Sequence, residues 1–518
     1  MRRNAVFRPD AINEVVLGER IDLGKLVAVA RHGARVSFSP EYGRRVERAR
    51  ALVEKWVDEG RVMYGVTTGF GAMCGQAIGR EETARLQKNI ILSHSTSVGE
   101  PFTPEQARAT MLMVLQNLGQ GYSGVRLAVL ERYRDFLNRD LVPWMPREGS
   151  VGYLCPEAHL ALVLIGMGQA WFQGELMPAG EALARAGLDP LELDSKEGLA
   201  LISGTTTTTA LGALALYDLL KAALSADIIG AMSLEASKGI IRAFDDRVMT
   251  MRPHEDQGRT AANVRRLLAD SEVIENSKHA RVQDALSLRC IPQLHGAVKK
   301  TLRDALKTIE TEMNSCCDNP LIWPDEDEPD IISACNADSS YVGLAMDSSA
   351  IAATMLAKMS ERRNNRLIDE SLSGYCGFLI KNPGLNSGLM IPQYTQAGLL
   401  NDMRILSTPA TIDNTPTCAS QEDYVGMGYN AAKKAVAVAE KLEYILAVEL
   451  LSAFAAQGFM NTTLRRGAAS RAILAEISSR IPPLENDTYL YPYINFIRGL
   501  IHSGKLIRLA EESAGPLH

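Results

Sequence analysis

The chain has 518 residues, of which 46% are hydrophobic and 22% charged, as in ordinary folded globular proteins. The formal net charge is −6 with both signs interspersed, which excludes the basic surface expected of a protein that binds nucleic acid or an anionic membrane. Aromatic residues make up only 6%, and the abundance of Ala, Leu, Met and Glu favours helices.

The cysteines indicate a reducing compartment. Eight are scattered along the chain without a CxxC pair, which is typical of free thiols in a cytosol and not of a disulfide framework or zinc site. The acidic stretch 324–330 is predicted to be a solvated loop, and no metal site is predicted. Residues 1–18 lack the apolar run of a signal peptide, and no window approaches 18 uninterrupted apolar residues. We therefore expect a cytoplasmic protein without a membrane span.

Two helices in the first quarter of the chain have clear start signals. Ser39, followed by proline and glutamate, predicts a helix that runs to about Gly60. Thr103 begins the same pattern and predicts a helix that ends at Gly119. Further long runs with apolar periodicity are expected to be mainly helical, and they cover residues 156–173, 206–237, 294–314, 341–366 and 430–458.

The last of these runs is apolar on nearly every face, so it must be buried by its own subunit or by another. Several such helices suggest a bundle core shared in an oligomer, and a monomer with a large core is the alternative. We predict a mainly α fold. Residues 1–200 would form a loop-rich helical domain, and residues 201–518 a long central helix bundle with C-terminal helices, the two making one intertwined catalytic unit.

Short polar motifs lie between the helices in a defined order. They are YGVTTGFG (64–71), SH (93–94), YSGVR (122–126), GSVG (149–152), KEGLAL (196–201), QDALSLR (283–289), DNPL (318–321), NSG (386–388) and SQED (420–423). From about residue 60 to 460, this set resembles the histidine and aromatic amino acid ammonia-lyase superfamily. The resemblance implies a largely helical homotetramer whose active sites are shared between subunits.

The loop PREGSVGYLCPEAH, residues 146–159, departs from the family pattern. In typical members GSVG is followed by Ala-Ser-Gly, which cyclises to a methylidene-imidazolone electrophile. Here Gly152 is followed directly by Tyr153, and matching Pro156 and His159 to the family shows that three residues are missing. Either the modified residue is absent from the printed sequence, or the protein lacks it.

Departures elsewhere favour a true absence. The family has Asn where this chain has Ser203, Tyr where it has Leu286, and an aromatic residue where it has Ala337. We therefore predict that the protein uses no cofactor. The alternative is a methylidene-imidazolone group formed from Ala-Ser-Gly between Gly152 and Tyr153.

The resemblance assigns roles to several retained residues. Tyr64 matches the catalytic base, and since a free phenol has a pKa of about 10, nearby positive charge or helix dipoles would have to lower it. Arg289 matches the arginine that binds the substrate carboxylate, and Gln283 belongs to the same motif. His94 and Glu422 match the residues of histidine-type lyases, which indicates a substrate with an imidazole ring.

Lys381 precedes the NSG motif, where a lysine is unusual for the family. It is either solvated or directed into the pocket, where its charge would stabilise a developing anion. We predict that Tyr64, Lys381 and Glu422 are catalytic. The predicted substrate-binding residues are His94, Ser203, Gln283, Arg289, Asn336, Ala337 and Asp338.

A site with a base and a carboxylate clamp but no electrophile suits an amine that already leaves easily. A trimethylammonium group has this property; Ala337 would leave room for it, and Asp338 would offset its charge. These features resemble ergothionase, the superfamily member that eliminates trimethylamine from ergothioneine to give thiolurocanate. The partner would then be a small betaine. One alternative is a methylidene-imidazolone-dependent histidine or aromatic amino acid ammonia-lyase, with an amino acid substrate, and another is an inactive homologue.

Overall fold

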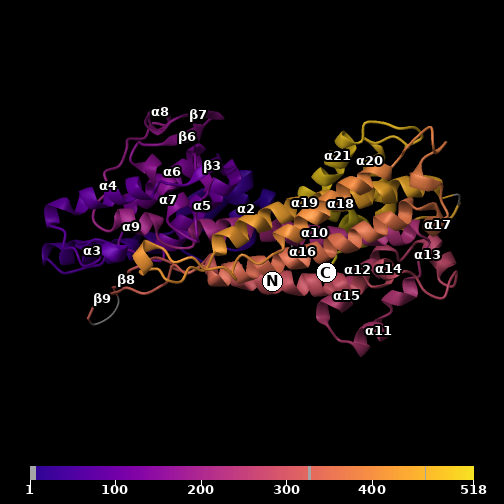
Figure 1. Ribbon diagram of the computed structural model, residues 1–518, viewed down its shortest axis with the longest axis horizontal. Coiled ribbons are helices and arrows are strands. Elements are labelled where there is room, and N and C mark those ends of the chain that lie inside the picture. The colour runs from indigo at the N-terminus through magenta and orange to yellow at the C-terminus, as the bar shows by residue number, and fades with distance from the viewer. Residues whose placement is uncertain (1–7, 325–327, 461–462) are drawn as a thin grey trace. The chain divides into compact units, whose positions relative to one another are not determined.

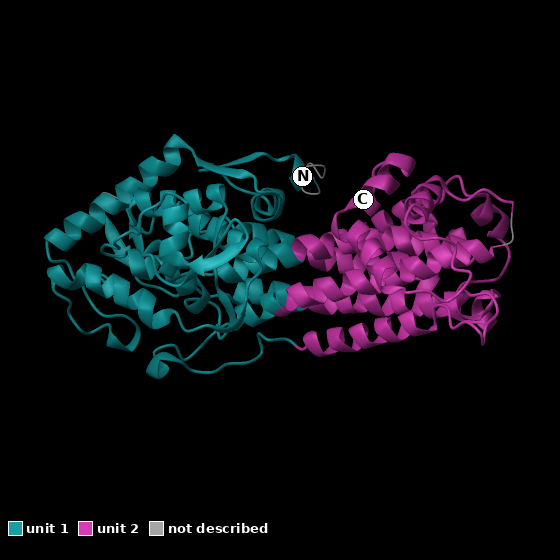
Figure 2. Ribbon diagram, turned by 90° about the horizontal axis from the view of Figure 1, so that it is seen from above, with its two compact units in different colours: residues 1–215, 306–347, 409–433 teal, residues 216–305, 348–408, 434–518 magenta. Residues whose placement is uncertain are grey.

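The computed structural model describes residues 8–324, 328–460 and 463–518. The chain forms two compact units, one of residues 1–215, 306–347 and 409–433 and the other of residues 216–305, 348–408 and 434–518 (Figure 2). The expectations for residues 1–7 and for the middle of the acidic stretch, residues 325–327, concern positions outside the described residues. The division of the chain at residue 200 remains a prediction.

Unit 1 combines short helices with small sheets. Its helices include α2 (Leu23–His32), α3 (Pro40–Asp58), α4 (Thr83–His94), α5 (Pro104–Leu118), α6 (Leu127–Arg139), α7 (Cys155–Leu164), α8 (Ala179–Arg185) and α9 (Glu197–Ile202). Its 3-10 turns are η1 (Pro9–Ala11), η2 (Gly71–Met73), η3 (Arg80–Glu82) and η6 (Cys418–Ser420). The sheets pair β1 (Glu14–Leu17) with β2 (Arg35–Phe38), β3 (Val98–Pro101) with β5 (Pro146–Glu148), β4 (Leu141–Pro143) with β6 (Gln169–Phe172) and β7 (Glu175–Pro178), and β8 (Leu321–Trp323) with β9 (Asp330–Ile332).

Unit 2 is helical in the described residues. Figure 1 labels four long helices, α10 (Thr206–Ala236), α15 (Ile291–Glu312), α16 (Ser340–Ile368) and α19 (Gly428–Phe459). Each of them has residues in both units. The remaining elements are η4 (Ile241–Phe244), α11 (Asp246–Met251), α12 (Glu255–Leu267), α13 (Glu272–Ser277), α14 (Leu286–Arg289), α17 (Glu370–Ser373), η5 (Gly377–Leu379), α18 (Met390–Leu406), α20 (Ala468–Ser478), α21 (Tyr491–His502) and α22 (Lys505–Ala514).

Small residues on α10 allow its neighbours to pack closely. A β-carbon at Gly230 would lie 3.1 Å from the side chain of Ile291 on α15, and Arg363 of α16 is also beside this glycine. Arg363 and Glu449 of α19 form a fully buried ion pair at 2.6 Å. Because both charges are removed from water, each requires the other, and the pair fastens α16 to α19.

The predicted helices are largely confirmed. The Ser39 hydroxyl caps α3 by accepting from the N–H of Tyr42 at 3.2 Å, and Gln106 accepts from the N–H of Thr103 at the start of α5 at 3.0 Å. The run 156–173 is a correction, because α7 ends at Leu164 and residues 169–172 form β6. Gly166 and Gly168 have positive φ between these elements and end the helix.

The burial of the longest apolar helices shows how far a single chain covers their apolar faces. By length and composition, segments 197–236 and 428–459 could each cross a membrane, but the most apolar window of the first is entirely buried and that of the second mostly buried within the protein. The chain itself therefore covers most of α19, and the burial of this helix does not by itself require another subunit.

Candidate active site

Tyr64 lies in the loop that follows α3, where glycine allows a tight backbone path. Gly65 has a φ of 64°, and a β-carbon there would lie 2.3 Å from a methyl carbon of Leu199. The loop continues into η2, where the N–H of Gly71 donates to the Tyr64 hydroxyl oxygen at 2.8 Å. The phenol is therefore held by the backbone of its own loop.

The surroundings of Tyr64 keep its hydroxyl protonated. Burial raises the pKa of Tyr64, and the negative charge of Glu422 raises it further, as do the thiols of Cys418 and Cys74. The Gly71 N–H acts in the opposite direction, because it stabilises the phenolate. Among the described residues of one chain, none of the groups that shift the pKa of Tyr64 carries the positive charge expected there.

His94 is the last residue of α4, and its ring orientation is set by the helix. Its Nδ1 lies 2.8 Å from the carbonyl oxygen of Ile90 and 3.1 Å from the hydroxyl of Ser93. Because the carbonyl can only accept, Nδ1 carries the proton and Nε2 is left as an acceptor. Burial lowers the pKa of His94, although Ile90 and the charge of Glu422 partly oppose this shift.

Glu422 is held by a short loop with an unusual backbone. The hydroxyl of Thr417 donates to the Glu422 carboxylate at 2.8 Å, and the backbones of these two residues also pair. Between them, Cys418, Ala419 and Ser420 all have left-handed φ angles, of 52°, 53° and 65°. Such a run of non-glycine residues is strained, and strain of this kind concentrates at functional sites.

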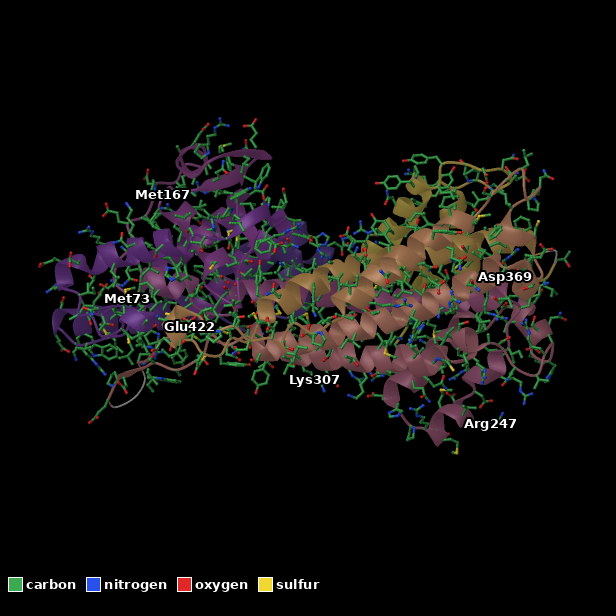
Figure 3. The ribbon with its side chains drawn as sticks, in the orientation of Figure 1. Met73, Met167, Arg247, Lys307, Asp369 and Glu422 are labelled. Atoms are coloured by element: carbon green, nitrogen blue, oxygen red, sulfur yellow. The ribbon has the colours of Figure 1, made fainter. Side chains whose placement is uncertain are left out.

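The carboxylate of Glu422 acts on the pKa values of two of the predicted site residues of unit 1, Tyr64 and His94, and on that of Tyr153. Contacts between η2 and η6 bring the loops of Tyr64 and Glu422 together, and Figure 3 labels Met73 of η2 and Glu422. The structure thus relates Glu422 to both Tyr64 and His94, and the roles that the resemblance assigns to these residues remain predictions.

Tyr153 is a site residue that the sequence analysis missed. Burial raises its pKa well above the ordinary value, and so do the charges of Glu422, Cys335 and Asp338 and a side-chain hydrogen bond with Glu422. It therefore remains a protonated phenol and acts as a hydrogen-bond donor at neutral pH. Its position directly after the GSVG motif was the available signal, but the motif alone does not show where the side chain points.

The loop around Tyr153 does not fit the methylidene-imidazolone group. Gly152 is bonded directly to Tyr153, and the Gly152 carbonyl accepts from the hydroxyl of Thr208 at 2.8 Å. Leu154, with φ 79° and ψ −65°, closes a γ-turn of the rare strained type, with the Cys155 N–H 3.2 Å from the Tyr153 oxygen. The tightly closed loop contains no Ala-Ser-Gly from which the group could form.

The other predicted residues of unit 1 have clear partners. Ser203 is buried, and its hydroxyl accepts from the N–H of Asn319 at 3.2 Å. Asp338 accepts from the N–H and the hydroxyl of Ser340, both at 3.0 Å, and its charge acts on Tyr153. Asn336, in contrast, donates to the carbonyl of Cys316. Ala337, between them in the chain, is partly buried.

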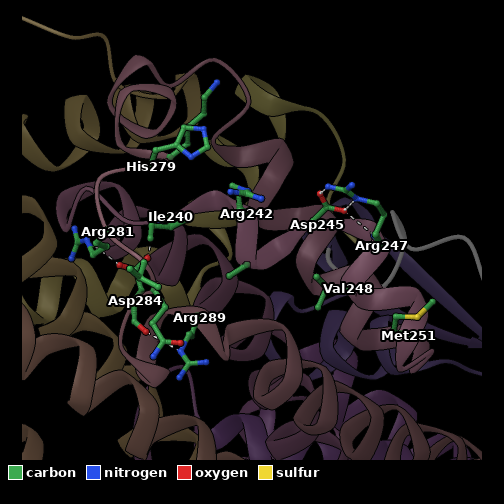
Figure 4. A pocket seen from close by; sticks show the side chains of 14 residues that line it. Ile240, Arg242, Asp245, Arg247, Val248, Met251, His279, Arg281, Asp284 and Arg289 are labelled. Atoms are coloured by element: carbon green, nitrogen blue, oxygen red, sulfur yellow. Dashed lines mark hydrogen bonds and ion pairs between the residues drawn. The ribbon is translucent and has the colours of Figure 1, made fainter.

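Gln283 and Arg289 belong to unit 2, where they line an open cavity of about 760 Å³ (Figure 4). The Nε of Arg289 donates to the Asp284 carbonyl at 2.9 Å, and this contact orients the guanidinium group. Arg242 and Arg281 line the same cavity, as do Lys278 and His279. Asp245 and Asp284 also line the cavity, but the arginines and the lysine outnumber these acids, a composition suited to a carboxylate.

Lys381 is also in unit 2 and is exposed at the protein surface. Its ammonium group pairs with Glu485 at 2.6 Å, and both side chains are about 60% exposed. The structure does not bring Lys381 together with Tyr64 and Glu422 in one unit. Its catalytic role remains a prediction, and the surface ion pair accounts for the contact that it makes.

The low pKa of His94 predicts a pH-dependent stability. Below the ordinary histidine pKa of 6.5, the unfolded chain takes up a proton that the partly buried ring resists, so the folded state loses stability as the pH falls. Urea unfolding from pH 7.5 down to 5 should show a smaller pH-dependent loss in His94→Gln than in the wild type. The matched control is His254→Gln, since His254 is exposed, and it should keep the wild-type slope. Equal slopes in all three proteins would contradict the prediction.

Comparisons with known proteins agree over almost the whole chain. Residues 21–479 match the family model for aromatic amino acid lyases. A histidine ammonia-lyase from Symbiobacterium thermophilum is 44% identical over 97% of this chain and 99% of its own. The crystal structure of histidine ammonia-lyase from Trypanosoma cruzi superposes with a TM-score of 0.91 at 35% identity, covering 97% of this chain and 96% of that one. The predicted histidine ammonia-lyase-like fold is confirmed.

The resemblance to ergothionase is corrected by the same comparisons. Ergothionase from Treponema denticola has a TM-score of 0.88 but is only 26% identical, over 95% of this chain and 99% of its own. The much higher identity to a histidine ammonia-lyase contradicts the predicted elimination of trimethylamine from ergothioneine. It also contradicts the prediction that the reaction uses no cofactor, since histidine ammonia-lyases are the class associated above with methylidene-imidazolone.

The comparisons and the loop 149–155 differ on the family's electrophile. The relatives point to ammonia-lyase chemistry, and the loop of this chain lacks the residues from which the family's electrophile forms. Family membership itself does not depend on this loop, because the match extends through both units. The chain belongs to the aromatic amino acid lyase family and is a carbon–nitrogen lyase.

Proposed function

We propose that the protein is an ammonia-lyase that converts L-histidine to urocanate and ammonia. The observation that carries this proposal is the grouping of Tyr64, His94 and Glu422, in which one carboxylate acts on both a phenol and an imidazole. A carboxylate suits the imidazole ring of histidine and would not favour the apolar ring of phenylalanine. The histidine ammonia-lyases among the similar proteins support the same substrate.

Each group has a task that follows from its chemistry. Tyr64 removes the proton from the β-carbon, and Glu422 hydrogen-bonds the imidazole ring, which makes that proton more acidic. Arg289 binds the substrate carboxylate with its planar pair of donors. Asp338 and the Ser203 hydroxyl accept hydrogen bonds from the substrate ammonium group, which leaves as ammonia.

The proposed reaction requires a cation close to Tyr64, because the described surroundings raise the pKa of this phenol. We propose a homotetramer in which the cationic cavity around Arg289 of one subunit completes the acidic site of another. The exposed apolar side chains of Tyr341, Leu344, Ile351 and Met355 on α16 support such an assembly, since contact with another subunit would cover them. A cytoplasmic location is proposed on the free cysteines.

The direct test is an assay with L-histidine at neutral pH. The conjugated acrylate, followed by its absorbance, and ammonia, determined chemically, should form in equal molar amounts. Phenylalanine and tyrosine should give no comparable product. Ergothioneine serves as the comparison substrate. Absence of ammonia from histidine would refute the proposal, and absence of product from every substrate would favour an inactive homologue.

Mass spectrometry of the intact protein tests the prosthetic group without measuring activity. A chain heavier than the printed residues by Ala, Ser and Gly, less two waters, carries the methylidene-imidazolone group. A mass equal to that of the printed residues means that the group is absent. The ammonia assay is then the test of whether elimination proceeds with this chain's own residues.

Glu422→Gln should impair recognition of the imidazole ring. The amide keeps the size of the side chain but loses the charge, so kcat/KM for histidine should fall roughly tenfold to a hundredfold. Asp423→Asn, which removes a charge from the adjacent residue, is the matched control and should have little effect. Steady-state kinetics by absorbance measure both. A Glu422→Gln enzyme with wild-type kcat/KM would remove Glu422 from the imidazole site.

A further inference from the structure

Two consecutive backbone N–H groups of η2 hold two different parts of the candidate site. The N–H of Gly71 donates to the hydroxyl oxygen of Tyr64 at 2.8 Å. The N–H of Ala72 donates to the sulfur of Cys418 at 3.3 Å. One short turn therefore contacts both the predicted base and a residue that is distant in sequence.

Cys418 belongs to the strained loop that positions Glu422. The Thr417 N–H donates to the Glu422 carbonyl at 2.9 Å, and the Thr417 hydroxyl donates to the Glu422 carboxylate at 2.8 Å. These contacts close the loop at both ends, and the left-handed Cys418 is its first residue after Thr417. A shift of Cys418 would therefore be transmitted to the residues that orient the carboxylate.

The contact between Cys418 and η2 depends on a glycine. Gly71 has a φ of 56°, and a β-carbon there would lie 2.5 Å from the Cys418 sulfur. This distance is too short for a non-bonded contact between carbon and sulfur, so only glycine permits the observed approach. The close fit indicates that the thiol has a defined place against the turn.

We propose that Cys418 is a positioning residue that couples the loop of Tyr64 to the loop of Glu422 through the Ala72 N–H. The inference rests on the proposed function, in which these two residues act on the same substrate. Because the base and the imidazole-binding carboxylate lie on separate loops, a fixed link between the loops keeps their separation matched to the substrate. The link also steadies the Gly71 N–H against the Tyr64 oxygen.

The first expected result is a loss of activity in Cys418→Ala that a conservative replacement restores. Without the sulfur, the loops of Tyr64 and Glu422 are no longer held at a fixed separation, so kcat/KM at neutral pH should fall about fivefold to tenfold. Cys418→Ser, whose hydroxyl can still accept from the Ala72 N–H, should recover most of this activity. A Cys418→Ala enzyme with wild-type kcat/KM would overturn the proposal.

A double-mutant cycle isolates the contact itself. Gly71→Ala places a methyl group against the Cys418 sulfur, and in a Cys418→Ala background that clash is absent. The factor by which Gly71→Ala lowers kcat/KM should therefore be at least about fivefold smaller in the Cys418→Ala background than in the wild type. The backbone strain at Gly71 is present in both backgrounds and cancels. An equal cost in both backgrounds would overturn the proposal.

Hydrogen exchange of the full-length protein provides a test that needs no turnover. The peptide covering residues 64–74 should exchange faster in Cys418→Ala, because η2 is then less firmly held. Cys418→Ser, whose hydroxyl can still accept, should restore most of the protection. Cys74→Ala changes an exposed thiol next to the same turn and should match the wild type. Unchanged exchange in Cys418→Ala would overturn the coupling, whereas altered exchange without activity on histidine would contradict only the proposed function.

Discussion

Tyr64→Phe should lower kcat for the release of ammonia from histidine by about a thousandfold, with little change in KM. The substitution removes one hydroxyl and keeps the ring that packs in the loop, so substrate binding should persist while the β-proton loses its acceptor. The measurement is the initial rate of acrylate formation over a range of histidine concentrations.

Tyr394→Phe is the matched control, since it removes the hydroxyl of an exposed tyrosine on α18. It should leave both kinetic constants unchanged. Thermal unfolding of the two variants establishes that they fold equally well. A Tyr64→Phe enzyme that keeps more than about a tenth of the wild-type kcat would mean that another group removes the proton, because general base catalysis contributes more than this.

Arg289→Leu should lower kcat/KM by roughly a hundredfold to a thousandfold, mainly through KM. The leucine leaves the substrate carboxylate without its charged partner, and lysine at this position should restore only part of the loss because it lacks the planar pair of donors. Arg247→Leu changes another arginine of the same cavity, whose side chain is 85% exposed, and should have little effect. Comparable losses in both variants would indicate general electrostatic attraction in place of a specific clamp.

The proposed sharing of sites can be tested by combining the two inactive variants. Each site would take Tyr64 from one subunit and Arg289 from another, so co-expressed Tyr64→Phe and Arg289→Leu chains should form hybrids in which about a quarter of the sites carry neither change. Measured activity should exceed that of either variant alone. If both residues of each site came from one chain, mixing would restore nothing.

The start and end signals of several helices were readable from local sequence. Ser39 and Thr103 each precede a proline and an acidic residue, and α3 and α5 begin at those prolines. These signals depend on a few adjacent residues, so they can be recognised without knowledge of the fold. The run 156–173 was assigned wrongly because its apolar residues fit a buried helix or a short strand equally well. The change of direction at Gly166 and Gly168 separates the two elements.

The candidate site was only partly predictable. Motif order indicated that Tyr64, His94 and Glu422 belong together, but the direction of the Tyr64 pKa shift was not predictable, because burial and the charge of Glu422 depend on packing. Tyr153 was missed since its importance comes from where its side chain lies. Ergothionase was chosen from a few site residues, and the similarity of the whole chain overruled that choice.

The sequence by itself determined the mainly helical fold, the order of the functional loops and the absence of Ala-Ser-Gly after Gly152 in the printed chain. Each of these is a matter of local residue pattern or covalent order. Only the tertiary structure decided that Glu422 is the common neighbour of Tyr64, His94 and Tyr153, and that Cys418 contacts the turn that holds Tyr64. The physical reason is that hydrogen bonds and charge interactions act across a few ångströms of space, and the residues concerned are separated by hundreds of positions in the chain.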